Sequence, residues 1–327
     1  MTDPSMYPTD VVRTVPEGRV VYGMQLPIQS QSTLYVAPWE KQAGPGELAK
    51  IARVADEAGF FYIGVCDHTA IPARLSDAMG TTWYDTTATL GWLAALTTRT
   101  HLLSHVLVLA QRHPLRAAKE LSTLDLLSGG RLIVGVGAGH VPEEYELLTG
   151  GFADRGRHTD EAVSALARAF TTEFPELPGP RFPASGLGIS PRPVRQPRPP
   201  IWIGGSSPAA LRRTAAFGDG WLPQGTRRRD LPDHIARIRA LREELRGGAP
   251  LDIGTIVEPI HLAGVTGDWE LPSYVLKGGP AEIASSLREL VALGVNHLQV
   301  RFMARSAEEF CQQTEAFGAE VGPLLAP

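Results

Sequence analysis

The stretch SGGRLIVGVGAGH, residues 128–140, contains the pattern that decides the fold. Gly129 and Gly130 can supply the left-handed conformation that ends a helix, and a β-rich run from Arg131 to Gly137 follows them at once. Further glycines close this run, and His140 comes directly after them. A helix stop, a short strand and a turn in this order predict one unit of a parallel α/β fold.

The same unit recurs along the chain. β-rich runs alternate with stretches whose apolar residues repeat at three- and four-residue spacing, as helices require. The runs are Val20 to Leu26, Phe61 to Cys66, Leu102 to Leu109, Arg131 to Gly137, Ile201 to Gly204, Gly220 to Leu222, Ile253 to Val257 and His297 to Phe302. Eight parallel strands predict an α/β fold of the (β/α)8 TIM-barrel type, with a doubly wound sheet as the alternative.

Two insertions interrupt the repeat, one after strand 2 and one before strand 5. The first, Ile71 to Tyr84, is expected to lie over the barrel mouth. The second, Pro175 to Pro200, contains nine prolines and is expected to be an irregular lid or rim loop. Residues 1–19 are expected to form a flexible arm, and residues 20–327 a single domain.

Composition narrows the class of protein. The 31 basic and 35 acidic side chains give a formal charge of -4, which provides no general field for nucleic acid or anionic lipid. The first 18 residues contain no apolar core of the kind that signal peptides have. The two cysteines, Cys66 and Cys311, fall in different predicted elements. We therefore expect a cytoplasmic protein with neither a nucleic-acid nor a membrane partner.

Polar residues at or within two predicted strands are the first candidates for a ligand site, because barrel enzymes bind ligands at the carboxyl ends of their strands. Asp67 and His68 directly follow the second strand, where the carboxylate could orient an imidazole that moves protons near neutral pH. A polar pair that caps a loop is the alternative. Ser104, His105 and Val106 interrupt the third strand, and either a ligand or a core partner could satisfy the histidine.

Two glycine-containing turns are the other candidates. Gly137, Gly139 and His140 end the fourth strand, where glycine permits close approach to a flat ring or a phosphate. The segment Gly204-Gly205-Ser206-Ser207 precedes Pro208, which predicts a serine-capped helix whose free amides suit an anion. A tight turn and a capped helix without a ligand remain the alternatives.

Other chemistries find little support in the sequence. The motifs GxSxG, HExxH and CxxC do not occur. Asp67, His68, His105 and His113 lack the spacing typical of metal ligands, so we expect no metal site.

Taken together, these residues resemble the luciferase-like monooxygenase superfamily, and in particular its branch that uses the deazaflavin coenzyme F420. The resemblance runs from about Val20 to Phe302. It is carried by Leu107-Val108-Leu109, His113-Pro114, Ala118-Lys119-Glu120-Leu121, Ser128 to Gly139, Arg155-Gly156-Arg157, Asp160-Glu161-Ala162, Ile201 to Pro208 and Gly218-Asp219-Gly220-Trp221.

The resemblance implies a role for each candidate. Asp67 and His68 would lie beside the reactive edge of the ring, with His68 as the catalytic group and His140 as a second candidate. His105 and Val106 would form a non-proline cis peptide against the ring, with Ser104 preceding it. The stretch Gly137 to Glu143 would contact the ring and ribityl chain, and Gly204 to Ser207 the phosphate. Some sugar-phosphate dehydrogenases of this family carry a catalytic glutamate at the position of His140 and a tryptophan soon after Asp-His, where this chain has none, so we do not expect a sugar-phosphate substrate.

The implied activity is hydride transfer between F420 and a small organic substrate that carries a carbonyl, imine, activated alkene or alcohol. One alternative is an FMN-dependent two-component monooxygenase, which would need a flavin reductase as partner. Another is a non-catalytic flavin-binding barrel. A homodimer stays open as the assembly.

Overall fold

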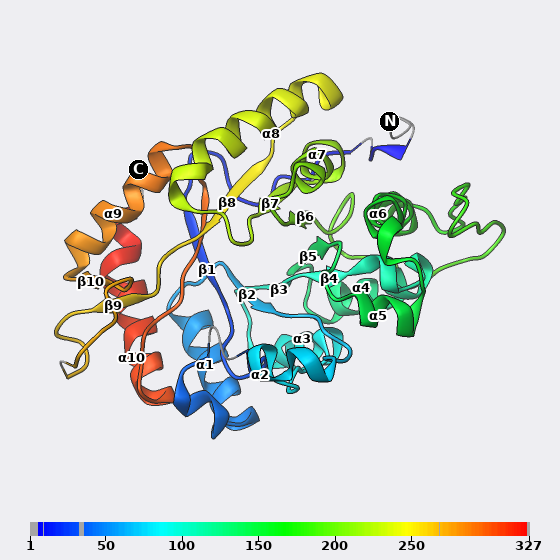
Figure 1. Ribbon diagram of the computed structural model, residues 1–327. Helices are drawn as coiled ribbons and strands as arrows, with labels where there is room; N and C mark the ends of the chain where they lie inside the picture. Colours follow the sequence, from blue (N-terminus) through cyan, green and yellow to red (C-terminus); the bar gives the residue numbers. More distant parts are fainter. Residues whose placement is uncertain (1–5, 9, 33–35, 268, 326–327) are drawn as a thin grey trace.

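The computed structural model describes residues 6–8, 10–32, 36–267 and 269–325 and confirms the barrel (Figure 1). Parallel pairing of β11 with both β1 and β8, and of β3 with both β2 and β5, closes the ring. The strands are β1 (Val21–Gln25), β2 (Tyr62–Val65), β3 (His101–Ser104), β4 (Leu107–Val108), β5 (Leu132–Gly137), β6 (Ile201–Gly204), β7 (Gly220–Leu222), β8 (Asp252–Ile256) and β11 (His297–Gln299).

Helices surround the barrel on its outside (Figure 1). Their apolar stripes pack against the strands. Gly129 and Gly130 follow helix α4 (Pro114–Leu127) with φ of +67° and +83°, as the predicted helix stop requires. The helices are α1 (Pro45–Glu57), α2 (Ser76–Met79), α3 (Thr86–Leu96), α4 (Pro114–Leu127), α5 (Pro142–Leu148), α6 (Arg155–Thr171), α7 (Pro208–Phe217), α8 (Leu231–Arg246), α9 (Pro280–Ala292) and α10 (Ala307–Ala316). Among the described residues, no helix combines the length and apolar character needed to cross a bilayer.

The third predicted strand differs from the expectation of one continuous run. It is divided into β3 and β4, and the peptide between His105 and Val106 at the division is cis. The cis peptide implied by the family resemblance is therefore present at the expected position.

The first insertion covers the barrel mouth. It contains a short 3-10 helix, Ala73–Leu75, followed by α2, and it contributes Met79 and Trp83 to the wall of the main cavity. Trp83 also pairs with Ser30, which follows β1, through an isolated antiparallel bridge.

The proline-rich insertion does not form the expected lid or rim loop. None of its residues, 175–200, lines the main cavity, and most of the segment projects outward beside α6 (Figure 1). Its end runs toward the foot of the barrel, where the amide of Arg195 donates to Asp125 and the buried Arg198 pairs with Asp219. These partners hold the chain on its way into the amino end of β6, away from the ligand side.

A further insertion after β8 was not predicted. It contains β9 (Ile260–Leu262) and β10 (Leu276–Gly278), which pair in parallel as a small separate sheet.

The amino-terminal segment makes buried contacts under the barrel. The amide of Val12 donates to Asp219, and the amides of Thr14 and Val15 donate to Asp252. Part of the predicted flexible arm, residues 1–5 and 9, lies outside the described residues, and the boundary between 19 and 20 stays a prediction.

Candidate active site

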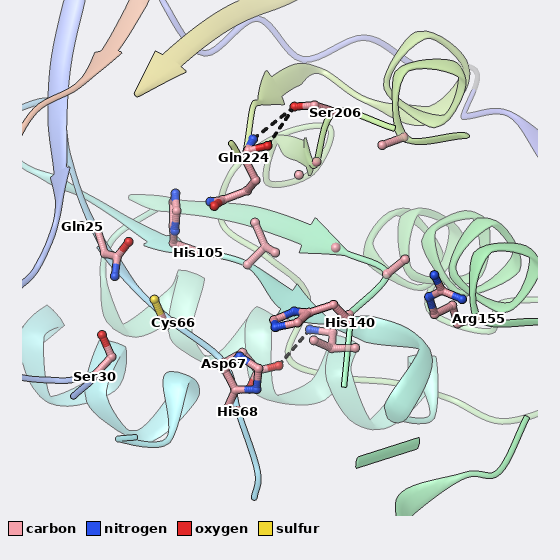
Figure 2. Close-up of a pocket in the computed structure, with 18 of the residues that line it drawn as sticks. Gln25, Ser30, Cys66, Asp67, His68, His105, His140, Arg155, Ser206 and Gln224 are labelled. Carbon is pink, nitrogen blue, oxygen red and sulfur yellow. Dashed lines mark hydrogen bonds between the residues drawn. The ribbon is translucent and has the colours of Figure 1, made fainter. Parts of the chain in front are cut away.

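A cavity of about 590 Å³ opens at the carboxyl ends of the barrel strands (Figure 2). This volume is in the range of small-molecule sites. Thirteen site residues were predicted, and the cavity is lined by all of them except Ser104 and Glu143. The lining set is Asp67, His68, His105, Val106, Gly137, Gly139, His140, Gly204, Gly205, Ser206 and Ser207.

Ser104 and Glu143 have other partners. The Ser104 side chain is fully buried, and its hydroxyl donates to the carbonyl of Gly135 at 2.9 Å. Glu143 lies on the rim, where it accepts two hydrogen bonds from Arg74 of the first insertion, at 2.6 and 2.9 Å. Neither side chain is therefore part of the cavity lining, and a contact of either with the cofactor stays a prediction.

The cis peptide His105–Val106 between β3 and β4 is called the bulge below, and from it Val106 projects toward two of the predicted glycines. A Cβ atom at Gly137 would lie 2.5 Å from one methyl of Val106, and a Cβ at Gly204 would lie 2.9 Å from the other. Real Cβ atoms essentially never come within 3.0 Å of a neighbour. Glycine at both positions thus makes room for Val106, a reason that was absent from the sequence-based interpretation.

His105 presents an unsatisfied polar group at the cavity wall. The residue is 4% exposed, and neither ring nitrogen has a hydrogen-bond partner among the described residues. Burial lowers the pKa of His105, which favours the neutral ring. The side chain of Gln299 lies close enough to raise the pKa of His105 through hydrogen bonding, an effect smaller than burial. The side-chain oxygen of Gln299 and both ring nitrogens nevertheless have no partner in hydrogen-bond geometry within the described part of the chain. Buried polar groups nearly always find a partner, so a bound molecule could supply one here.

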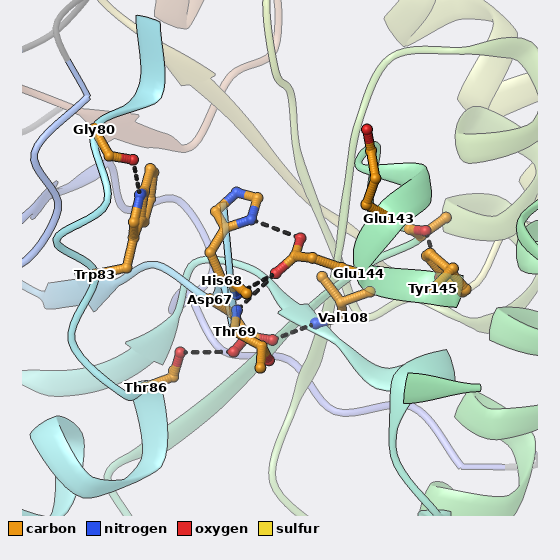
Figure 3. Close-up of polar contacts among 12 residues, drawn as sticks. Asp67, His68, Thr69, Gly80, Trp83, Thr86, Val108, Glu143, Glu144 and Tyr145 are labelled. Carbon is orange, nitrogen blue, oxygen red and sulfur yellow. Dashed lines mark hydrogen bonds and ion pairs between the residues drawn. The ribbon is translucent and has the colours of Figure 1, made fainter. Parts of the chain in front are cut away.

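Asp67 does not orient His68, contrary to the expectation from the sequence. Its carboxylate accepts two hydrogen bonds from the guanidinium of Arg112, both 2.8 Å long. The amide of Val108 donates a third at 2.8 Å (Figure 3). The hydroxyl of Thr86 donates to it at 3.2 Å. The hydrogen bonds of Asp67 thus go mainly to the segment after the bulge, which contains Val108 and Arg112.

The partner of His68 is Glu144, which the sequence-based interpretation missed. Nδ1 of His68 lies 2.9 Å from Oε2 of Glu144 (Figure 3). The ring also packs edge-on against Trp83, with centroids 4.4 Å apart, and against His140 at 5.4 Å. A tryptophan therefore contacts the predicted catalytic histidine, although it comes from the insertion and not from the residues soon after Asp-His.

His140 is the second imidazole at this end of the cavity. Burial lowers the pKa of His140, and the nearby His68 lowers it further. A neutral His140 can both donate and accept a hydrogen bond near neutral pH.

The opposite end of the cavity suits an anion. Ser207 caps α7 by accepting from the amide of Ala210 at 3.2 Å, and Pro208 occupies the first turn, as predicted. Ser206 is hydrogen-bonded to Thr226 and to the backbone of Gln224. The free amides and the positive dipole end of a helix attract negative charge.

Two arginines line the cavity and were not among the predicted site residues, and one of them, Arg213, is ion-paired with Asp160. Arg155 and Arg213 come from α6 and α7, and Figure 2 draws Arg155 on the cavity wall. In the sequence they are indistinguishable from ordinary charges on a helix surface. Only the packing of the two helices shows that they face the same cavity.

Metal and thiol chemistry find no support in the described part of the chain. His113, one member of the candidate metal set, caps α4 through its own ring nitrogen, and no group of three potential ligands is arranged to hold an ion there. Burial raises the pKa of the Cys66 thiol to about 11, which disfavours a reactive thiolate.

Comparison with known proteins identifies the family. The family model described as luciferase-like monooxygenase matches residues 22–262. An uncharacterized protein of Mycobacterium tuberculosis is 34% identical over 219 residues, which cover 63% of this chain and 75% of the relative. The F420-dependent glucose-6-phosphate dehydrogenase of Kineococcus radiotolerans is 25% identical over 88% of this chain and 95% of its own. The FMNH(2)-dependent dimethylsulfone monooxygenase of Pseudomonas putida is 23% identical over 84% and 86%.

Solved structures agree on the architecture. An F420-dependent secondary alcohol dehydrogenase, solved with an F420-acetone adduct, superposes with a TM-score of 0.73 over 94% of this chain and 100% of its own, at 15% identity. That likeness concerns the fold. Because the family model spans most of the barrel, the chain belongs to the luciferase-like monooxygenase family, and its relatives with a named activity include F420- and FMN-dependent oxidoreductases and monooxygenases.

Proposed function

We propose that the protein transfers a hydride between coenzyme F420 and a small organic substrate, with His68 as the group that gives or takes the accompanying proton. The observation that carries the proposal is the cavity itself. At one end lies His68, held by Glu144, and at the other lies a helix terminus that suits an anion, with the cis peptide His105–Val106 between them.

The residues present fit such a cofactor. F420 combines a flat ring with a phosphate-containing tail, and its ring supplies or accepts the hydride when bound. The unsatisfied ring of His105 and the glycine-lined wall suit the flat part. Arg155, Arg213 and the amides at the start of α7 suit the phosphate.

His68 would exchange a proton with the substrate, while Trp83 and Met79 would limit the access of water. His140 stands where some sugar-phosphate dehydrogenases of the family have a glutamate, so we expect a substrate other than a sugar phosphate. Carbonyl, imine, activated alkene and alcohol substrates all remain open.

Titration of the purified protein with F420 and with FMN, followed by the fluorescence of each ring, tests the cofactor. We expect much tighter binding of F420. Comparable affinities would remove the preference.

FMN-dependent oxygenation is the second candidate, and the relationship to the dimethylsulfone monooxygenase favours it. It would require a flavin reductase as partner. Without consumption of oxygen, either a loss of absorbance when substrate is added with oxidised F420 or a gain when it is added with reduced F420 would support hydride transfer. Oxygen consumption with reduced FMN would support the monooxygenase. Protein that binds a cofactor but does neither would be a non-catalytic barrel.

Two alanine variants assign the proton-transfer group. General acid-base groups contribute typically about 10² to 10⁴-fold to rates, so His68→Ala should slow hydride transfer in that range and weaken F420 binding far less. His140→Ala is the matched variant, because the ring of His140 contacts the ring of His68. A wild-type rate for His68→Ala together with a slow His140→Ala would reverse the two roles. A cytoplasmic location and a homodimer stay predictions.

A further inference from the structure

Glu144 is a buried carboxylate in the first turn of α5. Its side chain is 3% exposed, and each of its oxygens has a partner from the loop after β2. Oε2 lies 2.9 Å from Nδ1 of His68, while Oε1 accepts from the amides of Thr69 at 2.6 Å and Ala70 at 3.2 Å (Figure 3).

The carboxylate is ionised in this environment. Burial raises the pKa of Glu144, but the hydrogen bonds from His68 and from the two amides outweigh burial, and the net pKa lies below its ordinary value. An ionised carboxylate has no proton to donate. Nδ1 of His68 must therefore carry the hydrogen of the bond between them.

The remaining nitrogen of the ring is then defined. With Nδ1–H bonded to Glu144, a neutral His68 keeps its lone pair on Nε2. Nε2 makes no hydrogen bond to another described residue, and the ring is held on its sides by Trp83 and His140. Two other carboxylates lie nearby, but Asp67 forms an ion pair with Arg112 and Glu143 forms one with Arg74.

We propose that Glu144 is the positioning residue for His68. By accepting from Nδ1 and from two amides of the same loop, it fixes both the tautomer and the orientation of the ring, so that Nε2 is the atom that exchanges the proton. The sequence-based interpretation gave this role to Asp67. The catalytic use of Nε2 rests on the proposed function, whereas the tautomer does not.

The chain offers a sharp pair of variants. In Glu144→Gln, the two amides of Thr69 and Ala70 claim the single amide oxygen, which turns the NH2 group toward Nδ1 of His68. Nδ1 must then accept, and the proton moves to Nε2, the inverse of the wild-type tautomer. Glu143→Gln is the control, because the adjacent carboxylate bonds only the guanidinium of Arg74 in the described contacts.

Nitrogen-15 NMR of the imidazoles reads the tautomer directly in protein without cofactor, at alkaline pH, with the His68 signals assigned by their loss in His68→Ala. We expect Nδ1–H in the wild type and in Glu143→Gln, and Nε2–H in Glu144→Gln. Glu144→Asp, which keeps the charge, should retain Nδ1–H. A wild-type protein with Nε2–H, or a folded Glu144→Gln that keeps Nδ1–H, overturns the proposal.

F420 titration separates this inference from the proposed function. We expect Glu144→Gln to bind F420 within about threefold of the wild type, because the residue does not line the cavity. A loss of affinity above tenfold in a folded variant would make Glu144 a binding residue and overturn the positioning role. If the NMR spectra show the expected tautomers but the protein does not bind F420, the positioning role of Glu144 stands and the proposed use of F420 is wrong.

Discussion

Replacement of Asp67 by Asn tests whether this carboxylate supports the bulge or takes part in proton transfer. The side chain of Asp67 is 6% exposed and that of Arg112 is 20% exposed, so the pair is largely withdrawn from water. Each carboxylate oxygen accepts one hydrogen bond from Arg112. An amide in the same place would therefore always turn its NH2 group toward an N–H group of the guanidinium.

The expected loss follows from these contacts. Breaking a buried ion pair by removing one partner costs about 3–5 kcal/mol, because the other charge stays buried. The partial exposure of Arg112 lets water replace some of the lost interaction, so we expect Asp67→Asn to lower the free energy of unfolding by about 3 kcal/mol. That is a large share of the 5–15 kcal/mol typical of folded domains.

Urea unfolding followed by circular dichroism measures the change, with Arg112→Met and the double variant completing a cycle. The double variant should be more stable than the sum of the single losses predicts, because no unpaired charge remains. The reasoning is refuted if Asp67→Asn unfolds at the wild-type urea concentration while its F420-dependent turnover is lost. Asp67 would then be a catalytic group.

Three further predictions concern the barrel and its mouth. Gly137→Ala should lower the free energy of unfolding by about 1–3 kcal/mol, because its Cβ would meet Val106, and adding Val106→Ala should recover most of that loss in urea unfolding. Burial lowers the pKa of His297 to about 3, so below the ordinary pKa of about 6.5 the unfolded chain binds a proton that the folded chain does not. Stability should therefore fall by up to about 1.4 kcal/mol for each pH unit of acidification between those values, and His297→Gln should flatten this slope. Equal slopes in urea series at several pH values would contradict the assignment. Ser206→Glu should repel the cofactor phosphate and weaken F420 binding at least tenfold, whereas Ser206→Gln, of the same size, should bind more tightly than the glutamate variant; equal affinities for the two would remove this turn from the phosphate site.

The sequence sufficed for the barrel because each strand and helix has its own local signal. Alternating β-rich runs and apolar helical stripes do not depend on distant contacts, and Gly129 and Gly130 end their helix as expected. The division of the third strand was not predicted, because the polar pair Ser104-His105 interrupts the apolar run but could equally lie within one continuous strand. Only the family resemblance implied the cis peptide there.

The candidate site was predicted less completely, for a physical reason. Glu143 and Glu144 are neighbours in the first turn of a short helix, and nothing in their spacing tells which one faces the barrel. Which glutamate faces the barrel depends on how α5 packs against a loop 76 residues earlier in the chain. In the structure Glu144, not Glu143, contacts His68. Arg155 and Arg213 were missed for the same reason, because their shared cavity exists only after α6 and α7 have packed.

The contacts of the amino-terminal segment also say something about the order in which the protein is completed during synthesis. Val12 is bonded to a residue 207 positions later, and Thr14 and Val15 to one more than 230 positions later. At about 5–20 residues per second, roughly ten seconds or more separate the appearance of this segment from that of its partners. Its amides must meanwhile be hydrogen-bonded to water or to other chains. The floor of the barrel is thus finished late, because the segment that closes it leaves the ribosome well before its partners do.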